Sequence, residues 1–316
     1  MALDLPSIGD GMTDLHRSAQ SGDRRALARM LSAIESGEVD VQTLIEAAPP
    51  TDTWDVMAIT GAPGVGKSVL VDAIMQRWAK QGHTTALLAV DPSSPRTGGA
   101  LLGDRVRMTT VDDPKLSHRV YVRSVATRKA IGSVPIVVGD MAAYLLGCGW
   151  DRVIIETVGA GQSELRCAAV ADRIVVVEGP ARGDGIQAEK AGLLELADLV
   201  LVNKCDLDGA ERHAAELTES YALGEEAPQV MLVSGLKGTG VDQAAEVMLD
   251  LAPSNRSTTA KMRERLHASL ERRLTSHPGY NQTLVDLSRG TIDIHEAMVL
   301  LLSERHESTG RDDQPR

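Results

Sequence analysis

Short apolar runs alternate with longer segments of helical periodicity through the middle of the chain. Each run is almost continuous in Val, Ile and Leu, which is typical of strands that are buried on both faces of a sheet. Strands that alternate with helices favour parallel pairing, with crossover helices on both faces. The pattern therefore predicts an α/β fold with a mostly parallel central sheet. The six predicted strands are Val56–Thr60, Thr84–Val90, Val153–Thr157, Ile174–Glu178, Leu199–Asn203 and Val230–Ser234.

The regions on either side of the predicted sheet have helical periodicity. Residues 12–47 are predicted to be helical, with Ser21 or Asp23 as the cap of the main helix and Gly37 at its end. A last helix is predicted over roughly Ile292–Leu302, and the polar residues after it predict disorder. We expect four parts: a helical N-terminal arm over residues 1–50, an α/β domain over 51–255, a helical C-terminal region over 256–303 and a disordered tail over 304–316.

About sixty residues separate the second predicted strand from the third, which is far longer than a simple crossover. One helix is predicted inside this interval, from Ser133 to Leu146, with Pro135 in its first turn. Connections of this length are usually functional. We therefore expect the interval to contribute residues to a binding site.

Composition argues against several classes of partner, with a local basic patch as the alternative. The 316 residues carry a net charge of −11, whereas a surface that binds duplex nucleic acid concentrates Lys and Arg. There is no Phe, so a base-stacking aromatic surface is not expected either. Cys148, Cys167 and Cys205 lack metal-ligand spacing and are typical of a reducing compartment. Without a targeting pattern or a long apolar run, we expect a cytoplasmic protein with no nucleic-acid or membrane partner.

The strongest functional signal is GAPGVGKS, Gly61–Ser68, between a predicted strand and a predicted amphipathic helix. Its glycines permit backbone angles that other residues resist, so that consecutive N–H groups can turn toward phosphates. The helix that follows adds the positive end of its dipole. Lys67 is expected to reach the β- and γ-phosphates, and the hydroxyl of Ser68 to bind Mg²⁺. The expected nucleotide-binding residues here are Gly61, Ala62, Pro63, Gly64, Val65, Gly66, Lys67, Ser68 and Val69.

The base is predicted by NKCD, Asn203–Asp206, at the end of a predicted strand. The carboxylate of Asp206 can accept both the N1 hydrogen and the exocyclic amine of guanine, a pattern that adenine does not offer. The side chains before it are expected to brace the base. SGLKG follows the next strand, where GTPases place a backbone N–H against the guanine carbonyl. The expected guanine-binding residues are Asn203, Lys204, Asp206, Ser234, Gly235 and Leu236.

Acidic residues at strand ends predict a Mg²⁺ site. Glu156, in ETVGAGQSE, ends a buried apolar strand, where a carboxylate is costly unless it binds a cation. Asp91 ends the second strand and Asp104 lies in LLGDRVRM; both can reach the same side as Ser68, because ligands bind at the carboxyl ends of strands in open α/β sheets. An Asp that caps a turn, or a Glu whose hydrogen bonds are satisfied, is the alternative. Gly159 would let its N–H approach the γ-phosphate.

Five segments together resemble the MeaB/ArgK GTPases, relatives of the metal-insertase branch of P-loop GTPases. The resemblance extends over most of the chain, from about residue 15 to residue 303, and rests on GAPGVGKS, DPSSPRTGGALLGDRVRM, VRSVATR, ETVGAGQSE and LADLVLVNKCD. It implies a P-loop NTPase fold with helical N- and C-terminal extensions. It also implies a GTP-dependent chaperone of an adenosylcobalamin-dependent acyl-CoA mutase, which gates cofactor loading, and a homodimer formed through the C-terminal helices.

The resemblance also implies roles for individual residues. The loop Gly61–Ser68 would hold the phosphates and Mg²⁺, with Lys67 facing the reacting phosphate. The acidic residues on the metal side would be Asp91, Asp104 and Glu156.

Two loops depart from the family pattern. KAIGS, Lys129–Ser133, stands where a glycine pair is usual, and GDGIQAEKAG, Gly183–Gly192, where GDxLQGIKKG is common. SGL also replaces the usual SAL. Since the nucleotide motifs are intact, we hypothesise a mutase partner other than the methylmalonyl-CoA enzyme, such as one that acts on a branched or hydroxylated acyl-CoA.

Hydrolysis is expected to be slow in the isolated protein. No Gln directly follows Gly159, where Ras-like enzymes position the attacking water, and Gln162 lies three residues on. Arginines in the long interval, such as Arg123, are candidates for transition-state charge or partner contact, with a solvent-exposed arginine as the alternative.

Two other functions stay open. A metal-insertase GTPase generally needs clustered Cys and His ligands, which are scattered here. A kinase of a transport protein needs an acceptor site, which nothing in the sequence marks.

Overall fold

The computed structural model describes most of the chain, which divides into two compact units, Met1–Arg265 and Leu266–Arg316. The described residues are 10–39, 41, 44, 56–92, 108–127, 134–157, 171–180, 197–222, 227–252, 262–263, 266–267, 270–271, 273–275 and 277–302.

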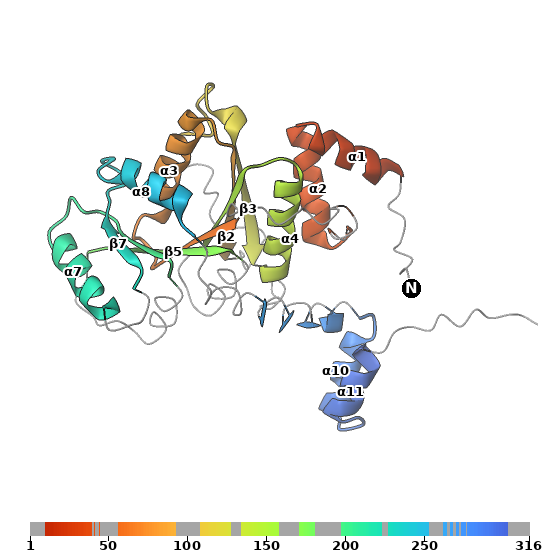
Figure 1. The fold of residues 1–316 in the computed structure, drawn as a ribbon. Helices are drawn as coiled ribbons and strands as arrows, with labels where there is room; N and C mark the ends of the chain where they lie inside the picture. The colour runs from red at the N-terminus through yellow and green to blue at the C-terminus, as the bar shows by residue number, and fades with distance from the viewer. Residues whose placement is uncertain are drawn as a thin grey trace, which may run out of the picture. The chain divides into compact units, whose positions relative to one another are not determined.

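Seven parallel strands are described in the first unit, in the order β3-β2-β4-β1-β5-β6-β7 (Figure 1). Since β2 to β4 lie on one side of β1 and β5 to β7 on the other, the sheet reverses its order beside β1. Ligands of open α/β sheets bind at such a point, outside the carboxyl ends of the strands. The predicted fold class is confirmed. The strands are β1 (Val56–Thr60), β2 (Thr85–Pro92), β3 (Val120–Thr127), β4 (Arg152–Thr157), β5 (Arg173–Glu178), β6 (Leu199–Val202) and β7 (Gln229–Leu232).

Strand β3 corrects the sequence prediction, which left these residues inside the long connection. It lies at the edge of the sheet and pairs with β2. Arg123 and Ser124 interrupt its apolar residues, so the run does not match a strand that is buried on both faces. An edge position accommodates such residues, because β3 is covered less completely than a central strand.

Hydrophobic cores lie on both faces of the sheet. On one face, helices α3 and α8 pack with Met57 and Ile59 of β1. On the other face, α2, α4 and α7 pack with Val56 and Ala58. The alternation follows from the geometry of a strand, whose successive side chains point to opposite faces. The helices of this unit are α1 (Asp10–Gln20), α2 (Arg24–Ser36), α3 (Lys67–Gln81), α4 (Val134–Gly147), α7 (Ala210–Tyr221) and α8 (Val241–Asp250), with a short 3-10 helix at Ser117–Arg119.

Helix α2 begins and ends where the sequence predicts. The carboxylate of Asp23 accepts hydrogen bonds from the backbone N–H groups of Arg25, at 2.8 Å, and Ala26, at 3.2 Å. Gly37 ends the helix with φ of +78°, a conformation that favours glycine. Both predicted ends of this helix are confirmed.

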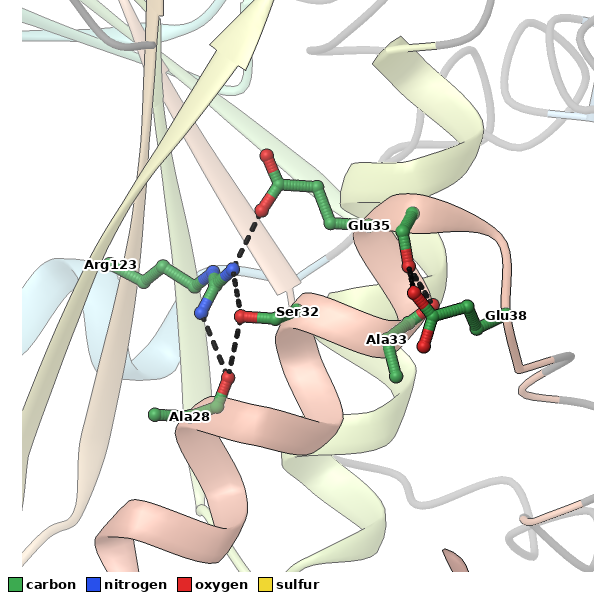
Figure 2. A network of polar contacts seen from close by, with 7 residues as sticks. Ala28, Ser32, Ala33, Glu35, Glu38 and Arg123 are labelled. Carbon is green, nitrogen blue, oxygen red and sulfur yellow. Dashed lines mark hydrogen bonds and ion pairs between the residues drawn. The ribbon is translucent and has the colours of Figure 1, made fainter. Parts of the chain in front are cut away.

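Arg123 of β3 attaches α2 to the edge of the sheet (Figure 2). Its guanidinium donates hydrogen bonds to the carbonyl oxygen of Ala28, at 3.1 Å, and to the hydroxyl of Ser32, at 3.1 Å. It also pairs with the carboxylate of Glu35 at 2.6 Å, and the two charged side chains are only 15% and 14% exposed. Arg123 is therefore a largely buried contact between elements of the fold and not a solvent-exposed arginine.

The described residues of the second unit include the short helices α10 (Tyr280–Ser288) and α11 (Ile294–Leu302). The second of these corresponds to the predicted last helix. Several apolar side chains of both helices are exposed: Leu284, Val285, Ile294, Met298, Val299 and Leu300. In the described part of the chain, no helix has the length and apolar character needed to span a bilayer.

Candidate functional site

The glycine loop joins β1 to α3 at the point where the sheet reverses its order. Gly61 has φ of +143°, and a Cβ atom there would lie 1.9 Å from the carbonyl oxygen of Val177 in β5. Gly64 and Gly66 also have positive φ, of +78° and +91°. Any other residue would clash or be strained, so the close approach of this loop to the neighbouring strand depends on its glycines.

Lys67 is the first residue of α3, and its side chain turns back over the loop. Its ammonium donates hydrogen bonds to the carbonyl oxygens of Gly61, at 2.6 Å, and Ala62, at 3.1 Å. The residue is only 7% exposed. A cation is therefore held beside the loop, at the N-terminal end of a helix, where an anionic group would also meet the helix dipole.

Ser68 and Glu156 meet at the carboxyl end of the sheet. The hydroxyl of Ser68 donates a hydrogen bond to Oε1 of Glu156 at 2.7 Å. Glu156 lies near the end of β4, is 4% exposed and is paired in register with Ile59 of β1 and Ala89 of β2. A hydroxyl and a carboxylate are the kinds of oxygen donor that Mg²⁺ takes in proteins.

The other predicted residues of the metal side are placed only in part. Asp91 lies in β2, and its backbone is in register with Ala126 of β3, but its side chain is outside the description. Asp104 and Gly159 lie outside the described residues altogether. The structure thus brings Ser68 and Glu156 together. The roles of Asp91 and Asp104 as metal ligands stay predictions.

Asn203 connects the glycine loop with the loop after β7. Its amide nitrogen donates hydrogen bonds to the carbonyl oxygens of Val65, at 2.8 Å, and Gly66, at 3.3 Å. Its amide oxygen accepts the N–H of Gly235 at 2.9 Å. These contacts join two loops, and Asn203 is only 3% exposed. Its expected role of bracing the base stays a prediction.

Lys204 continues this connection from the same loop. It has φ of +61°, which is uncommon for a residue with a side chain. Its ammonium donates a hydrogen bond to the carbonyl oxygen of Gly64 at 2.7 Å. The stem of the side chain therefore runs toward the glycine loop.

Asp206 is exposed beside these loops, where it can meet a base. The hydroxyl of Ser234 donates a hydrogen bond to Oδ1 of Asp206 at 2.6 Å. This hydrogen bond is the main cause that lowers the pKa of Asp206 below its ordinary value, with smaller contributions from a backbone hydrogen bond and from Lys237 and Lys204. The carboxylate is consequently charged at neutral pH, as an acceptor for two N–H groups needs to be.

Gly235 fits against α3 with no room for a side chain. A Cβ atom at this position would lie 2.8 Å from Cα of Leu70 and 3.0 Å from its backbone nitrogen. The next residue, Leu236, has 79% of its surface exposed. The replacement of SAL by SGL therefore coincides with a very close approach between this loop and the helix that follows the glycine loop.

Sequence reasoning missed the role of Asp72 in α3. Its carboxylate accepts hydrogen bonds from Thr109 and Thr110, in the connection between β2 and β3. An acidic residue among the buried apolar positions of a predicted helix was the available signal.

These features define a P-loop nucleotide-binding protein, since the glycine loop, Lys67 and Ser68 stand between the first strand and the first crossover helix of a parallel sheet. The chain matches the family described as "Methylmalonyl Co-A mutase-associated GTPase MeaB" over residues 27–278. It belongs to this MeaB/ArgK family and is a P-loop GTPase, which confirms the resemblance noted in the sequence.

Sequence similarity to individual proteins supports the same family. A Pyrococcus horikoshii protein named as a GTPase is 38% identical over 242 residues, which cover 74% of this chain and 75% of the relative. The GTPase ArgK of Escherichia coli K12 is 32% identical over 249 residues, 74% of each chain. A fused isobutyryl-CoA mutase of Cupriavidus metallidurans is 36% identical over 196 residues, 60% of this chain and 18% of that protein.

A solved structure shows the same fold. The crystal structure of a LAO/AO transport system kinase superposes with a TM-score of 0.63 over 93% of this chain and 98% of the other, at 21% sequence identity. At this identity the likeness concerns the fold alone.

Proposed function

We propose that this chain binds and hydrolyses GTP as a chaperone of an adenosylcobalamin-dependent acyl-CoA mutase. In this role it gates loading of the cofactor and protects or reactivates the mutase. The observation that carries the proposal is the similarity to a segment of a fused isobutyryl-CoA mutase, because a relative of this chain is there part of a mutase polypeptide. The description of the family as mutase-associated supports the same class of partner.

The glycine loop is proposed to bind the phosphates. Its N–H groups and the start of α3 would surround the β-phosphate, as in other P-loop proteins. The ammonium of Lys67, which lies over the loop carbonyls, would donate to the β- and γ-phosphate oxygens and stabilise charge that develops during hydrolysis. Gly159 is proposed to donate its N–H to the γ-phosphate.

Guanine is proposed to bind at Asp206. Its exposed carboxylate would accept the N1 hydrogen and the exocyclic amine, and a backbone N–H from the loop Ser234–Leu236 would meet the guanine carbonyl. Lys204 would pack its stem along the base. Asn203 would support this arrangement indirectly, by holding that loop and the glycine loop together.

Mg²⁺ is proposed to bind between Ser68, Asp91, Asp104 and Glu156. The hydrogen-bonded oxygens of Ser68 and Glu156 fit a small hard cation in chemistry and in proximity. The ion would polarise the phosphoryl oxygens of GTP. The hydrogen bond between the two side chains keeps both oxygens at the end of the glycine loop.

The four parts expected from the sequence are kept as a proposal, with residues 256–303 as a homodimerisation region. Exposed apolar side chains of α10 and α11 support this, because solvent exposure of many such residues is unfavourable. The departures at 129–133 and 183–192 and the similarity to an isobutyryl-CoA mutase support a partner that acts on a branched acyl-CoA.

Single-turnover hydrolysis of GTP, with and without purified mutases, tests the proposal. We expect slow hydrolysis by the isolated protein and an acceleration of at least about tenfold by isobutyryl-CoA mutase, since partners that order the residues around the phosphates accelerate GTPases. Methylmalonyl-CoA mutase should accelerate it less. Lys67→Ala, tested with the same mutases, is the control for contaminating GTPases. Equal rates with and without every mutase would contradict the chaperone role.

The same preparation distinguishes the alternatives. A metal insertase would bind nickel or zinc in a stoichiometric amount, and a kinase would transfer labelled γ-phosphate to a transport protein. We expect neither result.

A further inference from the structure

Glu178 and His213 form a buried polar pair that the proposed nucleotide site does not use. Glu178 ends β5, and His213 lies in the first turn of α7. Oε2 of Glu178 is 4.0 Å from Nε2 of His213, and the two side chains are only 10% and 14% exposed. A buried carboxylate is costly unless an attractive group faces it, and an imidazole attracts a carboxylate most strongly when it is protonated. The pair therefore connects the end of a central strand with the start of a helix.

Other features hold the start of α7 only weakly. Gly209 precedes the helix with φ of +88° and provides no capping side chain. The buried residues of α7 are Ala210 and Leu217, so apolar packing contributes little. Burial, and the charge of Glu178, raise the pKa of the Tyr221 hydroxyl at the far end of the helix, so this group stays neutral and adds no second charge. The position of the first turn consequently depends on its contact with Glu178.

Both ends of the loop that carries Asp206 return to Glu178. At the start of the loop, the backbone N–H of Asn203 donates to the carbonyl oxygen of Glu178 at 2.8 Å. At its end, the backbone N–H of His213 donates to the carbonyl oxygen of Gly209 at 3.0 Å, and the ring of His213 lies beside the carboxylate of Glu178. We propose that His213 is a positioning residue for guanine recognition, which fixes the end of this loop against β5 and so holds Asp206 against the base. The inference rests on the proposed function, in which Asp206 binds guanine.

The preference for GTP over inosine triphosphate (ITP) is the measurement that tests this role. ITP lacks the exocyclic amine of guanine, so the ratio of the two affinities reports a hydrogen bond that Asp206 is proposed to accept. His213→Phe keeps a ring and removes its nitrogens, and it should lower this preference about tenfold through a loss of GTP affinity. His213→Gln keeps an N–H donor and should retain the preference. Equilibrium competition against a fluorescent GTP analogue in EDTA gives both affinities.

Arg212→Gln is the matched control, because it removes a charge from the neighbouring position of α7, where the side chain is 85% exposed. It should leave both affinities unchanged. A preference that falls equally in His213→Phe and His213→Gln would overturn the role of the polar contact, and so would a wild-type preference in His213→Phe.

A double-mutant cycle separates positioning from a general effect on the fold. In an Asp206→Asn background, His213→Phe should cause no further loss of GTP affinity, because the residue that it positions no longer recognises guanine. An equal loss in both backgrounds would overturn the positioning role and leave the proposed guanine site intact. An Asp206→Asn variant that kept the wild-type preference for GTP over ITP would overturn both this inference and the proposed guanine site.

Discussion

The two sides of the proposed nucleotide site are built differently. The guanine side, Asn203–Asp206 with Ser234 and Gly235, is held by hydrogen bonds between loops, and most of these run from a side chain to the backbone. On the metal side, a hydrogen bond joins the side chains of Ser68 and Glu156. The guanine-side contacts join a side chain to a neutral backbone group, so they should depend little on ionic conditions. The carboxylates proposed for the metal side would instead repel one another unless a cation is bound.

This difference separates two kinds of control. Changes on the guanine side should alter which base is bound and how tightly, with little dependence on Mg²⁺. Changes on the metal side should alter hydrolysis and its Mg²⁺ dependence, with little effect on base selection. Substitutions that mix the two effects would show that the sides are coupled.

The largest effect is expected from Asp206→Asn. The amide cannot accept both N–H groups of guanine, so GTP affinity should fall about 1,000-fold, as in other sites that lose hydrogen bonds specific to their ligand. Xanthine has a carbonyl in place of the exocyclic amine, to which the amide can donate, so XTP affinity should rise. Competition of both nucleotides against a fluorescent GTP analogue measures the change.

Asp208→Asn is the matched control, because it removes the same charge from another exposed position of the same loop. It should leave both affinities unchanged. The wild type should also keep its GTP affinity in mildly acidic buffer: the pKa of Asp206 is lowered, so the charged form is lost only as the pH falls through that lowered value. Unchanged GTP affinity in Asp206→Asn would place base recognition elsewhere.

Glu156→Gln should have the next largest effect, on the metal side. The substitution keeps an acceptor for Ser68 and removes the negative charge, so GTP hydrolysis at a fixed Mg²⁺ concentration should fall about 100-fold. Affinity for GTP in EDTA and the preference for GTP over XTP should remain. Mg²⁺ titration of single-turnover rates measures the effect.

Glu178→Gln provides the comparison for that substitution. Glu178 is likewise buried at the end of a strand, at 8% exposure, but its carboxylate lies 4.0 Å from His213 of α7. A loss of Mg²⁺ dependence in both variants would point to a general effect of strand-end carboxylates and would remove Glu156 from the metal site.

Local patterns predicted the framework of the fold. Continuous Val, Ile and Leu runs located the central strands to within about two residues, and the cap at Asp23 and the end at Gly37 located α2. Strand β3 was not predicted, because the partner of Arg123, Glu35, lies 88 residues earlier in the chain. A polar residue in a strand is explained only by the element packed against it.

The candidate site shows the same limit. The glycine loop and NKCD were evident from sequence, because each carries its chemistry within a few consecutive residues. The contact between Asn203 and Val65 joins residues 138 positions apart, and no local pattern encodes it. Fold class and ligand class are thus local signals, while the connections that hold the loops together are tertiary.

The smallest of the three effects is expected from Gly235→Ala, which tests whether the guanine side is held as tightly as its contacts suggest. The added Cβ would lie 2.8 Å from Cα of Leu70, so the loop must move away from α3 and stretch the hydrogen bond to Asn203. Overpacking of this kind costs about 1–3 kcal/mol. The melting temperature should fall by about 2–4 °C per kcal/mol, and GTP affinity should fall with it while the Mg²⁺ dependence stays unchanged.

Gly179→Ala is the control, since its Cβ would meet Val65 at an ordinary 3.5 Å. If Gly235→Ala melted at the wild-type temperature, the loop could move away from α3 without losing stability. A tightly held guanine side would then no longer explain base selection.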